Sequence, residues 1–448
     1  MTASLATVPP DPAAPLFKRF GSSAGAHVLI VPHSRIFDLP AELADRFDAG
    51  APDVVRLADA LGATALGEEP LDLVPQPAPQ SLSLNVSSAC NLSCGYCYAD
   101  RGSFNGAQPR PMSRDVARAA IDRLLADADA AQPVTVGFLG GEPFVNRALI
   151  HDMVGYAAGQ GARRGLDVRF SVTTNATLLT LDDLRLLREH PFAVTVSIDG
   201  GAAIHDRQRP RHDRTGSFAV LCARIAPLLA DPGQAQICAR ATVTRADLDL
   251  GARFAAIRAV GFRDIGFAPL RGPAGADALR DEDWPAYLSA LCRLARCEID
   301  AALDGAAIAF SNLAIALKQV HRGASAPYPC GAGGGYFSVA ADGRWYACHR
   351  AVGSSDYEMG DSRGLDAARR GRFLAHRHVH AQTDCGRCWA RYLCSGGCHQ
   401  EAAARTAASC DFIRGWLEFC LAAYCELTER RPDYFVAPHA PAIAELTS

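Results

Sequence analysis

From Ser81 onward the chain alternates strand-like and helix-like stretches, and this alternation constrains the fold more than any other feature of the sequence. The predicted strands are Leu82–Val86, Val134–Leu139, Val168–Thr173, Phe192–Ile198, Ile237–Val243 and Ile265–Pro269. The predicted helices are Ser113–Ala128, Arg147–Gln160, Leu181–Glu189, Ser217–Leu229, Leu248–Val260 and Asp281–Leu303. Because strands joined by helical crossovers run parallel, we predict an α/β fold with a helix-covered parallel sheet. Six units rather than eight favour a partial (β/α)6 barrel of the TIM type, with its chemistry at the carboxyl ends of the strands.

Two further parts flank the predicted barrel. Residues 1–80 predict a small α+β domain with the strands Phe17–Phe20, His27–Pro32 and Ile36–Pro40 and the helices Ala41–Phe47 and Pro52–Leu61. The proline-rich stretch Pro75–Pro79 predicts an extended linker. The last part of the chain is rich in cysteine. We therefore predict three domains, which are residues 1–80, 81–305 and 306–448.

Composition and charge exclude several classes of protein. The chain has 448 residues, a net charge of −3 and a pI near 6.5, so electrostatics give no reason to expect a nucleic acid or membrane partner. Met1–Leu16 lacks the basic start and apolar core of a signal peptide. The longest apolar stretch, Gly305–Leu317, is too short to cross a bilayer and predicts a buried helix. With 16 cysteines and no secretion signal, we expect a cytoplasmic protein that ligates metal rather than one that forms disulfides.

Three cysteines, Cys90, Cys94 and Cys97, follow the first predicted strand and therefore lie on a loop at its carboxyl end. A structural zinc site closes its tetrahedron with four protein ligands, and three thiolates leave one position open. An iron–sulfur cluster with one iron free for a small molecule matches this count better. A zinc site stays the alternative.

A second motif, Gly140-Gly141-Glu142-Pro143, ends the second predicted strand. Adjacent glycines let the backbone approach a ligand closely. The Glu142 carboxylate is suited to accept a hydrogen bond from an ammonium group. The alternative is an ordinary tight turn between a strand and a helix.

Together the two motifs resemble those of radical S-adenosylmethionine (SAM) enzymes. The spacing Cx3CxφC, with Tyr96 as the aromatic residue φ, is similar to their cluster loop, and the GGEP run is complete. The resemblance implies a [4Fe-4S] cluster on the three cysteines of the loop and SAM on its free iron. It also implies that the GGEP run binds the methionine amino group. One electron then splits SAM into methionine and a 5′-deoxyadenosyl radical, which abstracts a hydrogen from the substrate.

Later strand ends supply further candidates for SAM contacts. Thr174 and Asn175 end the third predicted strand, and Ser197 and Asp199 end the fourth. By the same resemblance, Ser197 and Asp199 lie near the SAM ribose and its surroundings. Arg209 matches the arginine that pairs with the SAM carboxylate, and the rivals for this role are Arg207 and Arg211. Asn and Asp also end strands for reasons of local turn geometry.

The cysteines of the last domain form a second pattern, which resembles the SPASM extension that holds two auxiliary [4Fe-4S] clusters. The pattern comprises Cys330, Gly343, Cys348, Cys385, Cys388, Cys394, Cys398 and Cys410. The resemblance assigns one cluster to Cys385, Cys388, Cys394 and Cys410. It assigns the other to Cys330, Cys348 and Cys398.

Several points about these cysteines stay open. The fourth ligand of the second cluster has no clear match, because Cys297 is far upstream in a helical stretch. Cys420 is a rival to Cys410, and two zinc sites are the alternative to two clusters. The remaining cysteines sit among apolar residues and predict core thiols: Cys222, Cys238, Cys292 and Cys425.

SPASM relatives mostly modify peptides, so the resemblance implies a precursor peptide as substrate and a flavodoxin or ferredoxin as electron donor. The GGEPFVN run ending at Asn146 and the loop Ser103–Gly106 look most like maturases that form thioether or carbon–carbon (cyclophane) crosslinks. A sulfatase-type or quinone-cofactor maturase is the runner-up, and a non-enzymatic zinc-binding adaptor is the alternative of another class.

Two further candidates lie outside the cluster motifs. The N-terminal domain resembles the peptide-recognition modules of peptide-modifying enzymes and would bind a leader peptide. The alternative is a strand-and-helix lid whose role is packing alone. His349, next to Cys348, is a candidate acid or base, with a packing role as the alternative.

Overall fold

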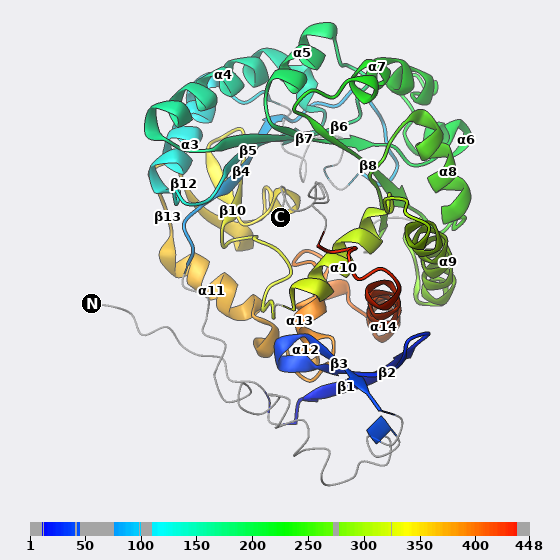
Figure 1. Ribbon diagram of the computed structural model, residues 1–448. Helices are drawn as coiled ribbons and strands as arrows, with labels where there is room; N and C mark the ends of the chain where they lie inside the picture. The colour runs from blue at the N-terminus through cyan, green and yellow to red at the C-terminus, as the bar shows by residue number, and fades with distance from the viewer. Residues whose placement is uncertain are drawn as a thin grey trace. The chain divides into compact units, whose positions relative to one another are not determined.

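The computed structural model describes residue 11 and residues 13–40, 43–44, 76–97, 99, 110–271, 277–323 and 325–436 (Figure 1). The predicted helix Pro52–Leu61, most of the predicted helix Ala41–Phe47 and the loop Ser103–Gly106 lie outside these residues.

The chain divides into two compact units, each assembled from separate stretches of sequence. We call the described residues of Gln76–Leu279 and Gly331–Phe373 the barrel unit. The described residues of Met1–Pro75, Arg280–Cys330 and Leu374–Pro441 form the auxiliary unit. The linear division into three domains stays a prediction.

The barrel unit contains a sheet of ten strands in the order β13-β12-β11-β10-β4-β5-β6-β7-β8-β9. Six of these strands are parallel and adjacent in chain order: β4 (Ser81–Ser87), β5 (Val134–Gly140), β6 (Val168–Thr174), β7 (Phe192–Ser197), β8 (Gln236–Val243) and β9 (Ile265–Pro269). They confirm the predicted α/β fold. The order ends at β9 on one side and β13 on the other, so the described strands form an open sheet rather than a closed barrel.

Four short strands extend the sheet beyond β4 and were not predicted from the sequence. They are β10 (Tyr336–Val339), β11 (Arg344–Tyr346), β12 (Glu358–Asp361) and β13 (Gly364–Leu365). β10 runs parallel to β4, and β11, β12 and β13 continue as antiparallel neighbours. The stretch between Cys330 and Cys348, which belongs to the predicted SPASM pattern, therefore supplies β10 and β11 to the sheet of the barrel unit.

Helices cover the outer side of the arc of parallel strands (Figure 1). They are α3 (Arg114–Asp127), α4 (Arg147–Arg164), α5 (Leu181–Glu189), α6 (Ala202–Gln208), α7 (Phe218–Ala230) and α8 (Leu250–Val260). Capping residues explain where two of these helices begin and end. The Ser113 side chain accepts from Val116 N at the start of α3, and Gly165 ends α4 at φ 68°. Inside, Phe138, Phe170 and Phe192 stack across β5, β6 and β7, with the last two ring centroids 5.2 Å apart.

The auxiliary unit combines an antiparallel sheet with helices of 4 to 24 residues. The sheet has the order β1 (Phe17–Ser22), β2 (Gly25–Ile30), β3 (Arg35–Leu39). These strands overlap the three strands predicted for this part of the chain. The helices are α9 (Trp284–Leu303), α10 (Ser311–Arg322), α12 (Thr383–Gly386), α13 (Arg391–Cys394) and α14 (Ala407–Arg430), while α11 (Ala367–Arg377) runs across the boundary of the two units. Phe20 and Leu29 share one apolar cluster with Leu417 and Leu421 of α14. The N-terminal sheet thus packs on the C-terminal helix.

Two predictions about helices need refinement. The predicted helix Asp281–Leu303 is a 3-10 turn, η4 (Asp281–Asp283), followed by α9, which begins at Trp284 with Pro285 in its first turn. The apolar stretch Gly305–Leu317 is helical only from Ser311. None of the described helices combines the length and hydrophobicity that crossing a membrane requires.

Candidate active site at the carboxyl ends of the parallel strands

The loop that carries Cys90, Cys94 and Cys97 follows β4 and is held by the segment after α6. Ser93 N donates to Pro210 O at 2.8 Å. The His212 ring contacts the loop twice, with Nε2 2.9 Å from Cys90 O and Nδ1 2.8 Å from Ser93 Oγ. Because a carbonyl only accepts, Nε2 carries the proton and Nδ1 accepts from the serine hydroxyl. The segment after α6 therefore fixes the cluster loop through the Cys90 carbonyl and the backbone and hydroxyl of Ser93.

The thiols themselves fit a cluster of positively charged irons. Burial raises the pKa of Cys90 to about 12 and also raises that of Cys94. Thiolates are the form that binds metal, so these buried sulfurs need a compensating positive charge. Among the residues that the structure describes, no group of three His, Cys, Asp or Glu side chains converges as ligands of one ion do. In a cluster each cysteine binds a different iron, so the sulfurs lie farther apart than the ligands of a single ion.

Gly140 and Gly141 lie directly against the loop before Cys90. Gly141 N donates to Ser87 O at 2.8 Å, and Glu142 N donates to Ala89 O at 2.9 Å. A Cβ on Gly140 (φ 150°) would lie 2.2 Å from Ser87 O, and one on Gly141 would lie 2.5 Å from Ala89 O. The two glycines thus let the end of β5 touch the cluster loop, a role that the sequence did not reveal. Pro143 opens the 3-10 turn η3 (Pro143–Asn146).

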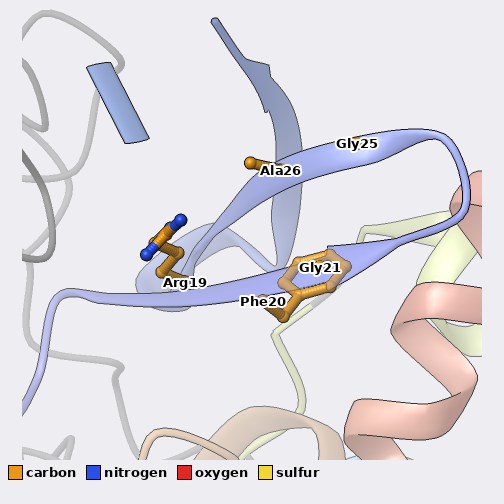
Figure 2. Close-up of a pocket in the computed structure, with 5 residues that line it drawn as sticks. All are labelled: Arg19, Phe20, Gly21, Gly25 and Ala26. Atoms are coloured by element: carbon orange, nitrogen blue, oxygen red, sulfur yellow. The ribbon is translucent and has the colours of Figure 1, made fainter. Parts of the chain in front are cut away.

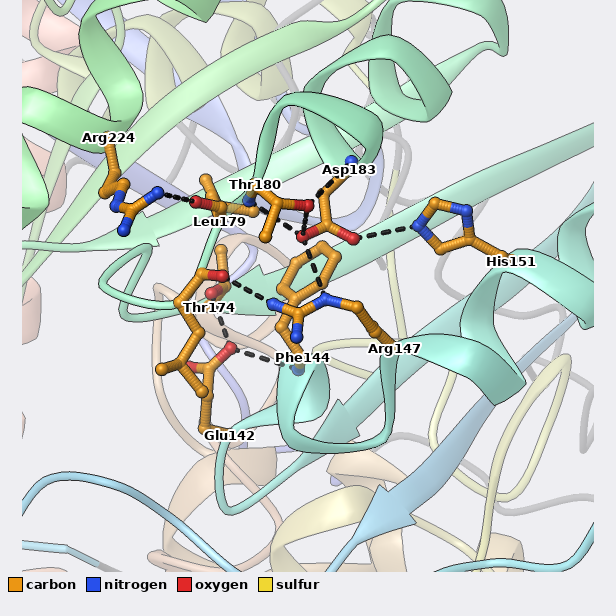
Figure 3. A network of polar contacts seen from close by, with 10 residues as sticks. Glu142, Phe144, Arg147, His151, Thr174, Leu179, Thr180, Asp183 and Arg224 are labelled. Carbon is orange, nitrogen blue, oxygen red and sulfur yellow. Dashed lines mark hydrogen bonds and ion pairs between the residues drawn. The ribbon is translucent and has the colours of Figure 1, made fainter.

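The Glu142 carboxylate is buried and turned toward the end of β6 (Figure 3). It accepts from Thr174 Oγ1 at 2.6 Å, Asn175 N at 2.8 Å and Phe144 N at 3.3 Å. Burial outweighs these hydrogen bonds and raises the pKa of Glu142 to about 7. Glu142 therefore ties β5 to β6, and its predicted contact with an ammonium group stays a prediction.

Asn175 connects the end of β6 to the cluster loop. Its Nδ2 donates to Asn91 Oδ1 at 3.0 Å and lies 4.0 Å from Cys90 Sγ. Its Oδ1 accepts from Thr177 N at 3.0 Å and Thr177 Oγ1 at 2.6 Å. The predicted residues at the ends of β4, β5 and β6 are thus brought together at one edge of the sheet.

At the end of β7, Asp199 and Arg209 form a buried ion pair. Arg209 Nε lies 2.9 Å from Asp199 Oδ2, and Nη2 lies 3.2 Å from Oδ1. The Tyr96 hydroxyl donates to the same carboxylate, and the guanidinium lies 5.2 Å from the centre of the Tyr96 ring. Burial opposes the charge of Arg209, but Asp199 and nearby Tyr96 and Cys94 raise the pKa of Arg209 above its ordinary value. Arg209 therefore stays charged beside the cluster loop.

Arg209 differs in position from Arg207 and Arg211, the two alternatives for the arginine that pairs with the SAM carboxylate. Arg207 is exposed on α6, and Arg211 is part of the strand-like bridge to Leu92 of the cluster loop. Ser197 is the last residue of β7 and is half-buried. The contacts of Ser197, Asp199 and Arg209 with SAM stay predictions.

Two buried residues that the sequence analysis missed hold this ion pair. His205 Nδ1 accepts from Asp199 N at 3.3 Å, and Nε2 lies 3.1 Å from Ser217 Oγ, which donates to Arg209 O at 2.6 Å. Burial lowers the pKa of His205 to about 4, so the ring is neutral and Nε2 donates. His205 and Ser217 thus connect the backbone of Asp199 to the backbone of Arg209, while the two side chains pair directly. The signal in the sequence was the spacing of His205 and Arg209, one helical turn apart.

A polar network around Asp183 supports the connection between β6 and α5 (Figure 3). The fully buried Asp183 carboxylate contacts His151 Nε2 at 2.8 Å and Arg147 Nε at 3.2 Å, and it accepts from Thr180 N at 2.9 Å. Arg147 Nη2 also donates to Leu178 O at 2.6 Å. The start of α4 is thereby fixed to the N-cap of α5, and the segment carrying Thr174 and Asn175 lies between them.

We expect Asp183→Asn to destabilise the protein by about 1–3 kcal/mol at pH 7, because it removes a charged acceptor from four donors. Burial raises the pKa of Asp183, but His151, Thr180 and Arg147 lower it below 3.8 overall. A lowered pKa gives stability that is present above pH 3.8 and is lost as the pH falls through the lowered value. Urea denaturation at pH 7 and pH 3 measures the difference, which we expect to shrink in acid.

The control is Asp182→Asn, which removes an exposed carboxylate from the same helix. We expect it to change stability by less than about 0.5 kcal/mol. An Asp183→Asn penalty that is equal at both pH values would contradict the assigned role.

The auxiliary unit brings four of the predicted ligands together. Cys388 N donates to Cys385 O at 3.0 Å, and α13 ends at Cys394. Burial and the neighbouring Cys385, Cys388 and Cys410 raise the pKa of Cys394 to about 11. Cys410 is thus a neighbour of the other three, whereas Cys420 is fully buried and lies near Cys292 instead.

The second predicted ligand set is divided between the units, with Cys348 in the barrel unit and Cys330 and Cys398 in the auxiliary unit. This set therefore stays a prediction. His349 Nδ1 lies 2.9 Å from Tyr336 Oη and 4.0 Å from Cys348 Sγ. Burial, with Arg350 nearby, lowers the pKa of His349 to about 4, so the ring is neutral at physiological pH. Its acid–base role stays a prediction as well.

A pocket of about 450 Å³ lies on the β1–β2 hairpin of the auxiliary unit (Figure 2). It is lined by Arg19, Phe20, Gly21, Gly25 and Ala26. Gly25 adopts φ 130° at the turn of the hairpin. None of the predicted cofactor-binding residues lines this pocket.

Comparison with known proteins agrees with these motifs. Residues 84–223 match the model of the radical SAM superfamily. An uncharacterized protein of Methanocaldococcus jannaschii is 34% identical over 129 residues, and the match covers 29% of this chain and 41% of that protein. The serine-type anaerobic sulfatase-maturating enzyme of Klebsiella aerogenes is 24% identical over 367 residues, which cover 77% of this chain and 86% of the enzyme.

Two solved structures share the fold. The structure of anSMEcpe with bound AdoMet has a TM-score of 0.66 at 19% identity, covering 82% of this chain and 97% of that chain. Streptococcus suis SuiB bound to its precursor peptide SuiA has a TM-score of 0.52 at 14% identity, covering 88% and 96%. With the cysteine motifs, these findings show a radical SAM domain in residues 84–223, and the chain shares the fold of the two solved structures.

Proposed function

We propose that this protein is a peptide maturase that holds a [4Fe-4S] cluster on Cys90, Cys94 and Cys97 and binds SAM beside it. When bound, the cluster and SAM supply the electron and the hydrogen-abstracting radical. The observation that carries the proposal is the convergence of the cluster loop, the Gly140-Gly141 turn and the Asp199–Arg209 pair at one edge of the sheet.

The residues of the chain have separable tasks in this proposal. The turn at Gly140 and Gly141 fixes the loop through the hydrogen bonds of Gly141 N and Glu142 N, and the turn would hold the amino acid part of SAM. Asp199 orients the Arg209 guanidinium beside Cys94, where the guanidinium is suited to donate to an anionic group of the cofactor. Tyr96 packs over the guanidinium and helps to exclude water from it.

We propose a ribosomally made precursor peptide as the substrate, acted on in the cytoplasm with a flavodoxin or ferredoxin as electron donor. SuiB, which shares the fold, was solved with a precursor peptide, and a sulfatase-maturating enzyme is similar over most of the chain. The favoured reaction is an intramolecular thioether or carbon–carbon crosslink. The peptide then loses two hydrogens, one as an atom taken by the radical and one as a proton. An auxiliary cluster, when bound, would accept the electron left behind on the peptide.

Sulfatase-type oxidation is the second candidate, supported by the 24% identical relative that matches 77% of the chain. Oxidation of a serine to an aldehyde also removes two hydrogens, so mass alone does not separate it from a crosslink. A hydrazine reagent that traps aldehydes does separate them. Fragmentation of the peptide is also blocked within a crosslinked ring and is complete in an aldehyde product.

The test begins with a search for a short reading frame beside the gene, followed by co-expression of the protein with the peptide that this frame encodes and by mass spectrometry of the peptide. We expect a loss of two hydrogens, no reaction with hydrazine, and a gap in the fragment series. An unmodified peptide with active SAM cleavage would contradict the peptide substrate, and a hydrazine adduct would favour the sulfatase-type reaction. The zinc-binding adaptor predicts zinc instead of iron in anaerobically prepared protein.

A further inference from the structure

Two arginines of the auxiliary unit donate hydrogen bonds to sulfur atoms of the predicted cluster ligands. Arg405 Nη1 donates to Cys385 Sγ, and Nη2 donates to Gln382 Oε1 at 2.9 Å. Gln382 Nε2 in turn donates to Arg377 O at 2.9 Å. The Arg405 guanidinium is therefore oriented by the protein toward the thiol and does not sample solvent freely.

Gly396 provides the space for this arrangement. It adopts φ 77°, and a Cβ at this position would lie 2.5 Å from Gln382 Nε2. The turn after Cys394 thus allows Gln382 to lie close to the backbone and to orient the guanidinium.

The second arginine, Arg414, lies on α14 one turn after Cys410. Arg414 Nη2 donates to Asp411 Oδ1 at 2.5 Å, and a further side-chain hydrogen bond goes to Cys388. Asp411 faces solvent, whereas Cys388 is half-buried. Two of the four thiols in this ligand set therefore have a cationic donor, and each donor comes from a different segment of the chain.

Among the residues that the structure describes, neither arginine is paired with a buried carboxylate. Asp411 is 71% exposed and forms only a surface pair with Arg414, and the other partner of Arg405 is an uncharged amide. The positive charge directed at the sulfurs is therefore not explained by the surrounding protein. It is explained if the sulfurs carry negative charge in the working protein.

Hydrogen bonds to the sulfurs and the net charge nearby set the reduction potential of an iron–sulfur cluster. Reduction adds one negative charge to the cluster, and a fixed cation stabilises the reduced state more than the oxidised state. We propose that Arg405 and Arg414 raise the reduction potential of the cluster that Cys385, Cys388, Cys394 and Cys410 hold. This inference rests on the proposed function, because that function places a cluster on these cysteines.

The test is a potentiometric titration followed by electron paramagnetic resonance on the full-length protein, reconstituted anaerobically. The three cysteines of the SAM cluster are replaced by alanine in every sample, so only auxiliary clusters contribute. Cys394→Ala identifies the signal of the site by its loss together with part of the iron. The variants are Arg405→Gln, Arg414→Gln and the double variant.

We expect the double variant to lower the equilibrium constant for reduction of this site at least tenfold, which is a downward shift of 59 mV for a one-electron couple. Each single variant shifts the potential in the same direction by less. Arg430→Gln is the matched control, since it removes the same charge from the same helix at a site paired with Glu426. It leaves the potential unchanged. A signal of the other auxiliary cluster serves as an internal reference.

The inference is overturned if the double variant keeps its iron and its signal but has the potential of the parent. The proposed function is left intact by that result. If Cys394→Ala retains all iron and all signals, no cluster is bound there, and the ligand assignment fails together with the inference. Should Arg405→Gln lose the cluster, Arg414→Gln carries the test, with the same expected direction.

Discussion

Replacing Asp199 by Asn is expected to destabilise the barrel unit by about 3–5 kcal/mol, because it leaves the Arg209 charge buried without a counter-charge. The substitution preserves the shape of the side chain, so packing changes little. It removes the charged acceptor of Arg209, of the Tyr96 hydroxyl and of Thr242 N, which donates at 2.9 Å. We also expect SAM cleavage to be lost, since the cluster loop contacts this pair through Tyr96.

Urea denaturation of the cofactor-free protein measures the first effect, and deoxyadenosine formation measures the second. The control is Asp231→Asn, which affects a solvent-exposed pair with Arg188 at 3.6 Å. We expect it to change stability by less than about 1 kcal/mol. A stability of Asp199→Asn within this same range would show that Asp199 does not hold Arg209 as described.

The second large effect is expected from Gly141→Ala. Its new Cβ would lie 2.5 Å from Ala89 O and 3.1 Å from Cys90 Cβ, so the backbone before the first cysteine must move. Overpacking of this kind costs about 1–3 kcal/mol, and the hydrogen bonds that Gly141 N and Glu142 N make to the loop are strained with it. We expect the variant to fold but to bind less iron at the loop and to lose most SAM cleavage.

A glycine in an open position provides the matched control. Gly155 lies inside α4, and a Cβ there would meet no atom within 4 Å. Gly155→Ala is therefore expected to keep iron and activity and to gain up to about 1 kcal/mol from helix propensity. If Gly141→Ala retains full iron content and cleavage, the close contact of the two loops is not required for the site.

The sequence predicted those parts of the fold that depend on local periodicity. All six parallel strands and the helices α3, α4, α5, α7 and α8 between them lie where hydrophobic patterning placed them, whereas the seven-residue helix α6 was not predicted. The extension β10 to β13 was missed because strands of two to four residues are too short to show alternation. The grouping of the chain into units was also hidden, because the packing of Phe20 against Leu421 joins residues four hundred positions apart.

The candidate site was predictable in its residue types but not in its contacts. The motifs identified Glu142, Asp199 and Arg209, and the sequence analysis predicted that each of these side chains contacts SAM. The structure shows that Glu142 is engaged by Thr174 and that Asp199 and Arg209 engage each other. Such pairings depend on which side chains meet at adjacent strand ends, and spacing along one chain does not report them. Arg405 was missed for the same reason, since it approaches Cys385 from a separate segment.

Deoxyadenosine formation is the measurement that tests the central claim most directly. Wild type and Cys90→Ala are reconstituted anaerobically with iron and sulfide, supplied with SAM and dithionite, and assayed by chromatography. The account predicts that the wild type produces deoxyadenosine and methionine and that Cys90→Ala produces none, although it still holds the auxiliary clusters. Cleavage by Cys90→Ala at the wild-type rate would contradict the account, because the loop after β4 would then not carry the reactive cluster.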